Sequence, residues 1–200
     1  MQVKNWMVKE VITIPPHCAL VEALTLMKQY SIRHLPVVEN KTLLGLISES
    51  DLRQCLISSS LMDEMRLDQI MIKNPVTIGP NESMEEAARL IYRYKIGGLP
   101  VVERGKLVGI LTTPDILTAF IQLMGVLEAS SRLDIQLAAR PKSFEEASGV
   151  IQKKGGEIIS VGMMGKGKKK TYLFRLKRTP LEPIIQALEK NGHKVISSVE

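Results

Sequence analysis

The sequence predicts an α+β protein in which two duplicated units form a pseudo-symmetric pair and a C-terminal βαββαβ unit follows. Three observations predict this fold class. A stretch of 50 residues recurs 64 positions later without a gap, both copies show the same order of helical and strand-like patterns, and the charge balance changes after residue 129. We expect the three units to span residues 1–60, 61–128 and 129–200.

The repeat aligns residues 4–53 with residues 68–117, and 18 of the 50 aligned positions are identical. The stretch GLISESD (residues 45–51) returns as GILTTPD (residues 109–115). Two copies are too few for a solenoid, whose repeats need several neighbours to bury a continuous core. We therefore expect the two copies to pack on each other.

Each copy contains, in order, a short extended piece stopped by prolines, an amphipathic helix, two strands joined by a polar turn, and a second helix. Apolar residues recur at helical spacing in HCALVEALTLMKQYSI, whereas LPVVE and TLLGLIS are rich in β-branched and other apolar residues. In the first copy these elements are expected at residues 13–14, 17–32, 35–39, 42–48 and 49–56, with the turn at residues 40–41.

The last third of the chain has its own pattern of elements and its own charge. Residues 130–200 hold 14 Lys and Arg against 7 Asp and Glu, while the rest of the chain holds 13 against 14. Strand, helix, strand, strand, helix and strand are expected at residues 132–139, 144–155, 157–164, 171–178, 180–192 and 193–199. This βαββαβ order is the ferredoxin-like arrangement.

Composition excludes several classes of protein. No apolar run approaches the ~18 residues of a membrane span, and the start MQVKNWMVKE lacks the apolar core of a signal peptide. Cys18 and Cys55 are too few for a disulfide framework and lack metal-ligand spacing. These observations predict a protein of the reducing cytoplasm without a membrane partner.

The basic run GKGKKK (residues 165–170) lacks the spacing of a phosphate-binding loop and lies between two expected strands. We interpret it as a solvated hairpin tip, with electrostatic contact to an acidic partner or nucleic acid as the alternative. No aromatic residues alternate with its lysines, so nucleic-acid binding is not expected. No catalytic triad, metal cluster or carboxylate pair is recognisable, which predicts a protein that is not an enzyme.

A hydroxyl precedes a carboxylate by three residues at the expected start of each second helix: Ser48 and Asp51, then Thr112 and Asp115. This pattern is typical of a capping box, in which side chains pair with the free N–H groups of the first turn. The same helix start could hold a nucleotide, because N–H groups suit a phosphate and a carboxylate accepts the hydroxyls of a ribose. The two interpretations are compatible, and both remain open.

The doubled motifs, hxhhPVV(D/E) and G-h-h-(S/T)-x-x-D, resemble the CBS domain, and the tandem copies resemble a CBS pair, or Bateman module, over about residues 4–125. This resemblance implies regulatory binding of AMP, ADP, ATP or S-adenosylmethionine in clefts between the copies, with no required cofactor. By resemblance, the ribose would be held by Asp51 and Asp115, and Ser48 and Thr112 would lie near phosphates. The adenine would be bordered by Thr13, Ile14, Thr77 and Ile78, although ordinary strand starts explain these four equally well.

The copies differ just before LPVV, where the first has Arg33-His34 and the second Gly97-Gly98. Basic residues at this place often reach phosphates in CBS pairs, and His34 could add charge near neutral pH. The alternatives are a solvated arginine and a histidine satisfied at a strand edge. We expect the cleft with Arg33 and His34 to favour the more phosphorylated ligand, and the other, with only backbone donors at Gly97 and Gly98, to be weaker or empty.

The C-terminal unit resembles an ACT domain by its element order. The turn ARPKSF keeps Pro141 but has Lys142 where such domains have glycine, so a dimerising unit is as plausible as an amino-acid site. A CBS pair followed by an ACT domain resembles the acetoin-utilisation B-type proteins of bacteria. The resemblance implies a homodimeric regulator of an unidentified protein, in acetoin or carbon metabolism. The alternative is a structural or dimerisation scaffold whose CBS clefts are empty.

Overall fold

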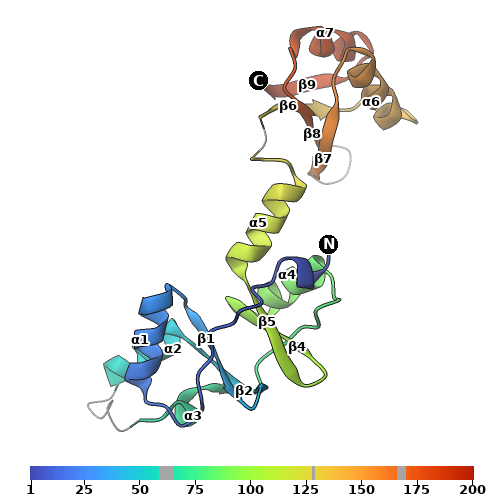
Figure 1. Ribbon diagram of the computed structural model, residues 1–200. Helices are drawn as coiled ribbons and strands as arrows, with labels where there is room; N and C mark the ends of the chain where they lie inside the picture. Colours follow the sequence, from blue (N-terminus) through green and yellow to red (C-terminus); the bar gives the residue numbers. More distant parts are fainter. Residues whose placement is uncertain (59–64, 128, 166–169) are drawn as a thin grey trace. The chain divides into compact units, whose positions relative to one another are not determined.

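The computed structural model describes residues 1–58, 65–127, 129–165 and 170–200 (Figure 1). The chain divides into two compact units, Met1–Leu117 and Thr118–Glu200. The first unit holds the aligned stretches of both copies, residues 4–53 and 68–117, and the division falls inside the last helix of the second copy. We describe each unit separately.

Each copy of the repeat folds into a helix, an antiparallel hairpin and a second helix, as the sequence predicts. The first copy consists of α1 (Leu20–Tyr30), β1 (His34–Glu39), β2 (Thr42–Ser48) and α2 (Glu49–Ser58), and the second of α4 (Met84–Tyr94), β4 (Gly98–Glu103), β5 (Lys106–Thr112) and α5 (Thr113–Leu123). The polar turn of the first hairpin has positive φ at Asn40 and Lys41, and that of the second at Arg104 and Gly105. Such two-residue turns match the right-handed twist of the strands that they join.

The expected extended piece before each first helix is reduced to a single bridge. Ile14 pairs with Val37 in parallel, and Ile78 pairs with Val101 in the same way. Both isoleucines are buried and pack beneath their own hairpin. The core of the first copy combines apolar residues of its own elements with Leu67, which comes from the N-terminal segment of the second copy: Ile14, Leu20, Ala23, Met27, Leu35, Val37, Ile47, Leu52 and Leu67.

The two copies exchange their N-terminal segments, a feature that the sequence did not predict. Val8, from the start of the first copy, pairs with Ile110 of β5 in the second. Its repeat equivalent Ile72, in β3 (Ile72–Lys73), pairs with Leu46 of β2 in the first copy. The short helices η1 (Val3–Asn5) and α3 (Leu67–Ile70) precede these pairings. The N–H of Val3 donates to the carbonyl of Glu82 in the second copy.

Gly45 and Gly109 make this exchange possible. A Cβ atom at Gly109 would lie 2.5 Å from Sδ of Met7 and 3.0 Å from the carbonyl oxygen of Val8. A Cβ atom at Gly45 would lie 2.5 Å from Sδ of Met71 and 3.0 Å from the carbonyl oxygen of Ile72. The crossing segment of one copy therefore lies directly on the bare backbone of the other.

The second unit has the expected βαββαβ order. Its elements are β6 (Ser130–Gln136), α6 (Ser143–Lys153), β7 (Ile158–Met164), β8 (Thr171–Lys177), α7 (Glu182–Lys190) and β9 (Lys194–Val199). The strands form one antiparallel sheet in the order β7-β8-β6-β9, with both helices packed on one face around the buried side chain of Phe174. The predicted hairpin tip falls mostly at residues 166–169, which lie outside the described residues.

Candidate functional site

A cavity of about 890 Å³ opens between the two copies of the repeat within the first unit. Ligand-binding pockets of proteins are typically about 300–1,000 Å³ and mostly apolar, with a few placed polar groups. Aliphatic side chains from both copies form the apolar part of the wall: Val8, Val11, Ile12, Ile32, Leu46, Ile72, Ile96 and Ile110. The cavity therefore has the size and the apolar walls that a nucleoside requires.

The starts of α2 and α5 both face this cavity and are closed by the same hydrogen bonds. The hydroxyl of Ser48 donates to Oδ2 of Asp51 at 2.6 Å, and the Ser48 N–H donates to the same oxygen at 2.8 Å. Thr112 makes the equivalent bonds to Asp115 at 2.6 and 2.7 Å. In the first copy the Asp51 N–H also donates to the Ser48 hydroxyl at 3.3 Å, which confirms the capping interpretation there, and the second copy shows the bonds of Thr112 to the Asp115 carboxylate. These bonds use one carboxylate oxygen of each aspartate, so they leave the ribose interpretation open.

The first N–H group of each of these helices is tied to the segment before the preceding hairpin. Glu49 donates its backbone N–H to the carbonyl of Arg33 at 3.0 Å, and Thr113 donates to the carbonyl of Gly97 at 3.1 Å. This bond places residues 33–34 and residues 97–98 next to the helix starts. A phosphate at either helix start would therefore meet these residues as well.

His34 fills the space that the second copy leaves empty. A Cβ atom at Gly98 would lie 2.7 Å from Cγ of His34, and one at Gly97 would lie 2.9 Å from both Cε1 and Nε2 of its ring. Since His34 and Gly98 are equivalent positions of the repeat, the imidazole crosses the pseudo-twofold axis onto its own counterpart. Side chains at both positions would collide, which explains why the copies differ here.

Burial lowers the pKa of His34, the positive charge of Arg33 lowers it further, and Asp51 opposes both. The ring is therefore uncharged over more of the neutral range than an exposed histidine. These surroundings oppose the expectation that His34 could add positive charge near neutral pH. Arg33 is exposed and lines the same cavity.

The structure adds four charged residues to the cavity that the sequence did not indicate: Glu10, Glu49, Arg53 and Lys95. Arg53 lies one helical turn after Glu49, and its Nη2 and Nε donate to Oε1 of Glu49 at 2.6 and 3.2 Å. Lys95 ends α4 two residues before Gly97. The i,i+4 spacing of Glu49 and Arg53 is a signal in the sequence that could have indicated this ion pair, but not its place in the cavity.

Eight of the twelve predicted site residues line this one cavity: Arg33, His34, Ser48, Asp51, Gly97, Gly98, Thr112 and Asp115. The sets from the two copies thus meet around a shared space. The remaining four do not belong to its lining. Thr13 and Thr77 are exposed, while Ile14 and Ile78 are buried under their hairpins, and Val11 and Ile12 reach the cavity in their place.

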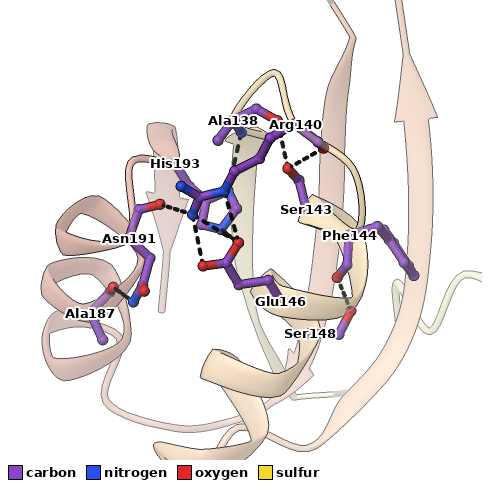
Figure 2. A network of polar contacts seen from close by, with 9 residues as sticks. All are labelled: Ala138, Arg140, Ser143, Phe144, Glu146, Ser148, Ala187, Asn191 and His193. Carbon is purple, nitrogen blue, oxygen red and sulfur yellow. Dashed lines mark hydrogen bonds and ion pairs between the residues drawn. The ribbon is translucent and has the colours of Figure 1, made fainter.

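A separate polar network closes the loop between β6 and α6 in the second unit (Figure 2). Arg140 donates to both carboxylate oxygens of Glu146 and to the carbonyl of Asn191, which joins this loop to the end of α7. The hydroxyl of Ser143 contacts the carbonyls of Ala138 and Arg140 at 2.6 and 2.7 Å. These groups satisfy one another inside the unit, so the network stabilises the loop.

Lys142, in the same loop, adopts φ 60° and ψ 17° at the residue before α6. This left-handed conformation favours glycine. The backbone conformation therefore accounts for the glycine that the ACT resemblance implies at this position. Lys142 adopts the same conformation at some cost in free energy.

His193 is the buried centre of this network. Its Nδ1 accepts the N–H of Ala138 at 3.2 Å, so Nε2 carries the proton of the neutral ring. Nε2 lies 3.9 Å from Oε2 of Glu146 and has no hydrogen-bond partner among the described residues. Burial lowers the pKa of His193, Glu146 opposes this effect and Arg140 adds to it. Protonation of Nδ1 would break the bond from Ala138.

We expect the second unit to lose stability as the pH falls below 6.5, the ordinary pKa of histidine. Below that pH the unfolded chain binds a proton that the folded ring resists, so the free energy of unfolding decreases until the folded pKa is passed. His193→Asn, whose amide oxygen can still accept from Ala138, should flatten this dependence in urea unfolding between pH 5 and 8. The exposed His17→Asn serves as the control, and an unchanged slope in His193→Asn would contradict the assignment.

Comparisons with known proteins bear on the first unit. A family model of the CBS domain matches residues 3–58 and 67–122, more than half of the chain. An inosine-5'-monophosphate dehydrogenase of Korarchaeum cryptofilum is 31% identical over 145 residues, which are 72% of this chain and 29% of that enzyme. The CBS domain-containing protein YhcV of Bacillus subtilis is 32% identical over 57% of this chain and 81% of its own length. The chain thus spans less than a third of the dehydrogenase.

Solved structures with the same fold include CBS pairs with bound adenosine compounds. The CBS domain pair of protein MJ0100, in complex with 5'-methylthioadenosine and S-adenosyl-L-methionine, is 30% identical with a TM-score of 0.56, over 60% of this chain and 95% of that one. CBSX2 in complex with AMP is 30% identical with a TM-score of 0.53, over 60% and 96%. A Vibrio cholerae protein named for acetoin utilization (AcuB) is 36% identical with a TM-score of 0.58, over 63% and 94%.

The described residues offer neither a metal site nor a membrane-spanning helix. No three side chains among His, Cys, Asp and Glu gather there in a way that could hold a metal ion. Within the same residues, every helix is too short or too polar to cross a bilayer.

Proposed function

Because the chain belongs to the CBS domain family, we propose that it is a non-catalytic regulatory sensor whose cavity binds an adenosine-containing ligand. Adenosine compounds occupy the solved CBS pairs of MJ0100 and CBSX2. The observation that carries the proposal is the meeting of two helix starts, each with a hydroxyl and a carboxylate, at one cavity with aliphatic walls.

The base, ribose and phosphate each have a matching surface in this cavity. Val11, Ile12 and Ile32 provide an apolar wall for the base. Asp51 or Asp115 accepts from the ribose hydroxyls, and a helix start together with Arg33 binds a phosphate. We propose the same eight lining residues that the sequence predicted as the ligand-binding set.

The exchanged segments give the ligand a means of changing the protein. Val8 and Ile72 line the cavity, and each also pairs with a strand of the opposite copy. A ligand that touches them contacts the joint between the copies directly. The ligand changes the packing of the copies only if it binds one of their arrangements more tightly than the other. A tenfold difference in affinity shifts the equilibrium between the two arrangements by about 1.4 kcal/mol.

The second unit is proposed as an ACT-like module, residues 129–200, that follows CBS domains at residues 1–60 and 61–128. In this proposal the chain forms a homodimer in the cytoplasm and passes cavity occupancy to a regulated protein. The likeness to the Vibrio cholerae protein favours a role in acetoin metabolism. The ferredoxin-like order of its elements supports the ACT assignment.

Asp51→Ala should weaken binding of AMP or S-adenosylmethionine at least about tenfold, because it removes the acceptor for the ribose hydroxyls. It should also lower the free energy of unfolding by about 0.5–2 kcal/mol through loss of the cap. Isothermal titration calorimetry measures the first effect, and urea unfolding the second. Ser83→Ala is the matched control, since the Ser83 hydroxyl caps α4 by accepting from the Glu86 N–H at 3.1 Å and lies outside the cavity.

The control variant should lose stability and keep its ligand affinity. Equal affinities for Asp51→Ala and the wild type would leave Asp51 with the capping role alone. If no adenosine compound binds or raises the melting temperature of the wild type, the proposed sensor function fails, and the scaffold with empty clefts is favoured.

A further inference from the structure

The charges around the cavity do not suit a highly anionic ligand. Carboxylates line it at Glu10, Glu49, Asp51 and Asp115, against cationic side chains at Arg33, Arg53 and Lys95. His34 adds little positive charge at neutral pH, because burial and Arg33 keep its pKa low. The cavity as a whole is therefore slightly negative, although Arg33 and His34 alone predicted a preference for the more phosphorylated ligand.

Arg53 is already engaged by an acid. Glu49 is the first residue of α2, beside the position at which a phosphate would meet the helix start. Its carboxylate accepts two hydrogen bonds from the Arg53 guanidinium, and Arg33 is close enough to lower the pKa of Glu49 as well. Glu49 is therefore ionised at neutral pH and neutralises part of the positive charge on the first-copy side.

We infer that the cavity selects adenosine compounds with at most one phosphate, or with a thioether or sulfonium group, over di- and triphosphates, and that Glu49 sets this preference. The inference rests on the proposed function and narrows its ligand class. A first phosphate fits the helix start and Arg33. Each further phosphate adds negative charge that meets Glu49, whose carboxylate already neutralises part of the charge of Arg53.

The opposite copy offers no replacement for this lost charge. Thr113 occupies the position equivalent to Glu49, and Leu117 the position equivalent to Arg53. Gly97 and Gly98 contribute only backbone there, so Lys95 is the cation on that side among the described lining residues. The negative charge of a polyphosphate is therefore no better neutralised on the side of the second copy than on the side of the first.

Calorimetry with adenosine, 5'-methylthioadenosine, AMP, ADP and ATP, without divalent cations, tests the inference on the full chain. The wild type should bind AMP at least about tenfold more tightly than ATP at low salt, and salt should reduce this ratio. Glu49→Gln should improve ATP binding by about fivefold or more, while changing adenosine and 5'-methylthioadenosine less than about twofold.

Glu86→Gln is the matched control. Glu86 pairs with Arg89 on α4, its side chain is 34% exposed like that of Glu49, and it lies outside the cavity. The control should leave the ratio of AMP to ATP affinity unchanged. Arg53→Gln gives a second variant, in which the unpaired Glu49 should lower ATP binding further.

The outcomes separate this inference from the proposed function. Tight ATP binding by the wild type, equal to that of AMP or better, overturns the inference and leaves the sensor function intact. The same holds if Glu49→Gln shifts all five ligands equally or shifts none. Failure of every adenosine compound to bind overturns both.

Discussion

Replacing Gly45 or Gly109 by alanine should destabilise the N-terminal unit by about 1–3 kcal/mol, the usual cost of overpacking. The new methyl group would meet the sulfur of Met71 or Met7 at 2.5 Å. A flexible methionine could move aside, but the carbonyl oxygen behind it, at 3.0 Å, belongs to the crossing backbone and cannot move without weakening the pairing. The substitution should therefore weaken the contact between the two copies.

The single tryptophan of the chain, Trp6, reports on one of the two crossing segments and not on the other. Gly109→Ala should change its fluorescence before global unfolding, because Met7 and Val8 lie on Gly109. Gly45→Ala acts on the other segment and should change this fluorescence only with global unfolding. Gly79→Ala, where a Cβ meets Glu82 at an ordinary 3.5 Å, should stay within about 0.5 kcal/mol of the wild type. Equal effects of all three substitutions would refute this packing.

Gly98→Ala should cost about 1–3 kcal/mol, because its methyl group would lie 2.7 Å from Cγ and 2.8 Å from Cδ2 of His34. The ring can retreat only toward the cavity that it lines. We expect the substitution to displace His34 into the cavity and to reduce ligand binding as well.

A double-mutant cycle isolates this contact. His34→Ala removes the two ring atoms and leaves its own Cβ 3.2 Å from the new methyl group, so His34→Ala with Gly98→Ala should recover at least about 1 kcal/mol relative to the sum of the single changes. Urea unfolding of the four proteins gives the coupling free energy. Strict additivity would show that the ring does not pack on Gly98.

Local patterns predicted the elements of both units because each element is specified by residues near one another in the chain. The turns at Asn40-Lys41 and Arg104-Gly105 and the helix starts at Ser48 and Thr112 appear where those residues indicated them. The repeat also predicted that the copies would pack on each other. Even the capping interpretation needed only residues three positions apart.

Features that depend on contacts between the copies could not be predicted in this way. The residues around Val8 do not indicate that this segment pairs with β5 of the other copy, because a short apolar segment could equally pair with its own hairpin. The position of Glu49 and Arg53 at the cavity depends on how α2 faces the second copy. Thr13 and Thr77 were predicted to border the ligand, but both are exposed and neither lines the cavity. Repetition alone could not distinguish a residue of the cavity wall from an exposed strand start.

Because each copy supplies the N-terminal segment that covers the backbone of its neighbour, neither half alone reproduces this packing. A protein made of one half alone would have to cover the backbone at Gly45 or Gly109 with its own N-terminal segment or with that of a second molecule. Duplication within one chain thus converts a concentration-dependent association into a permanent intramolecular one, and the cavity between the halves exists at any dilution.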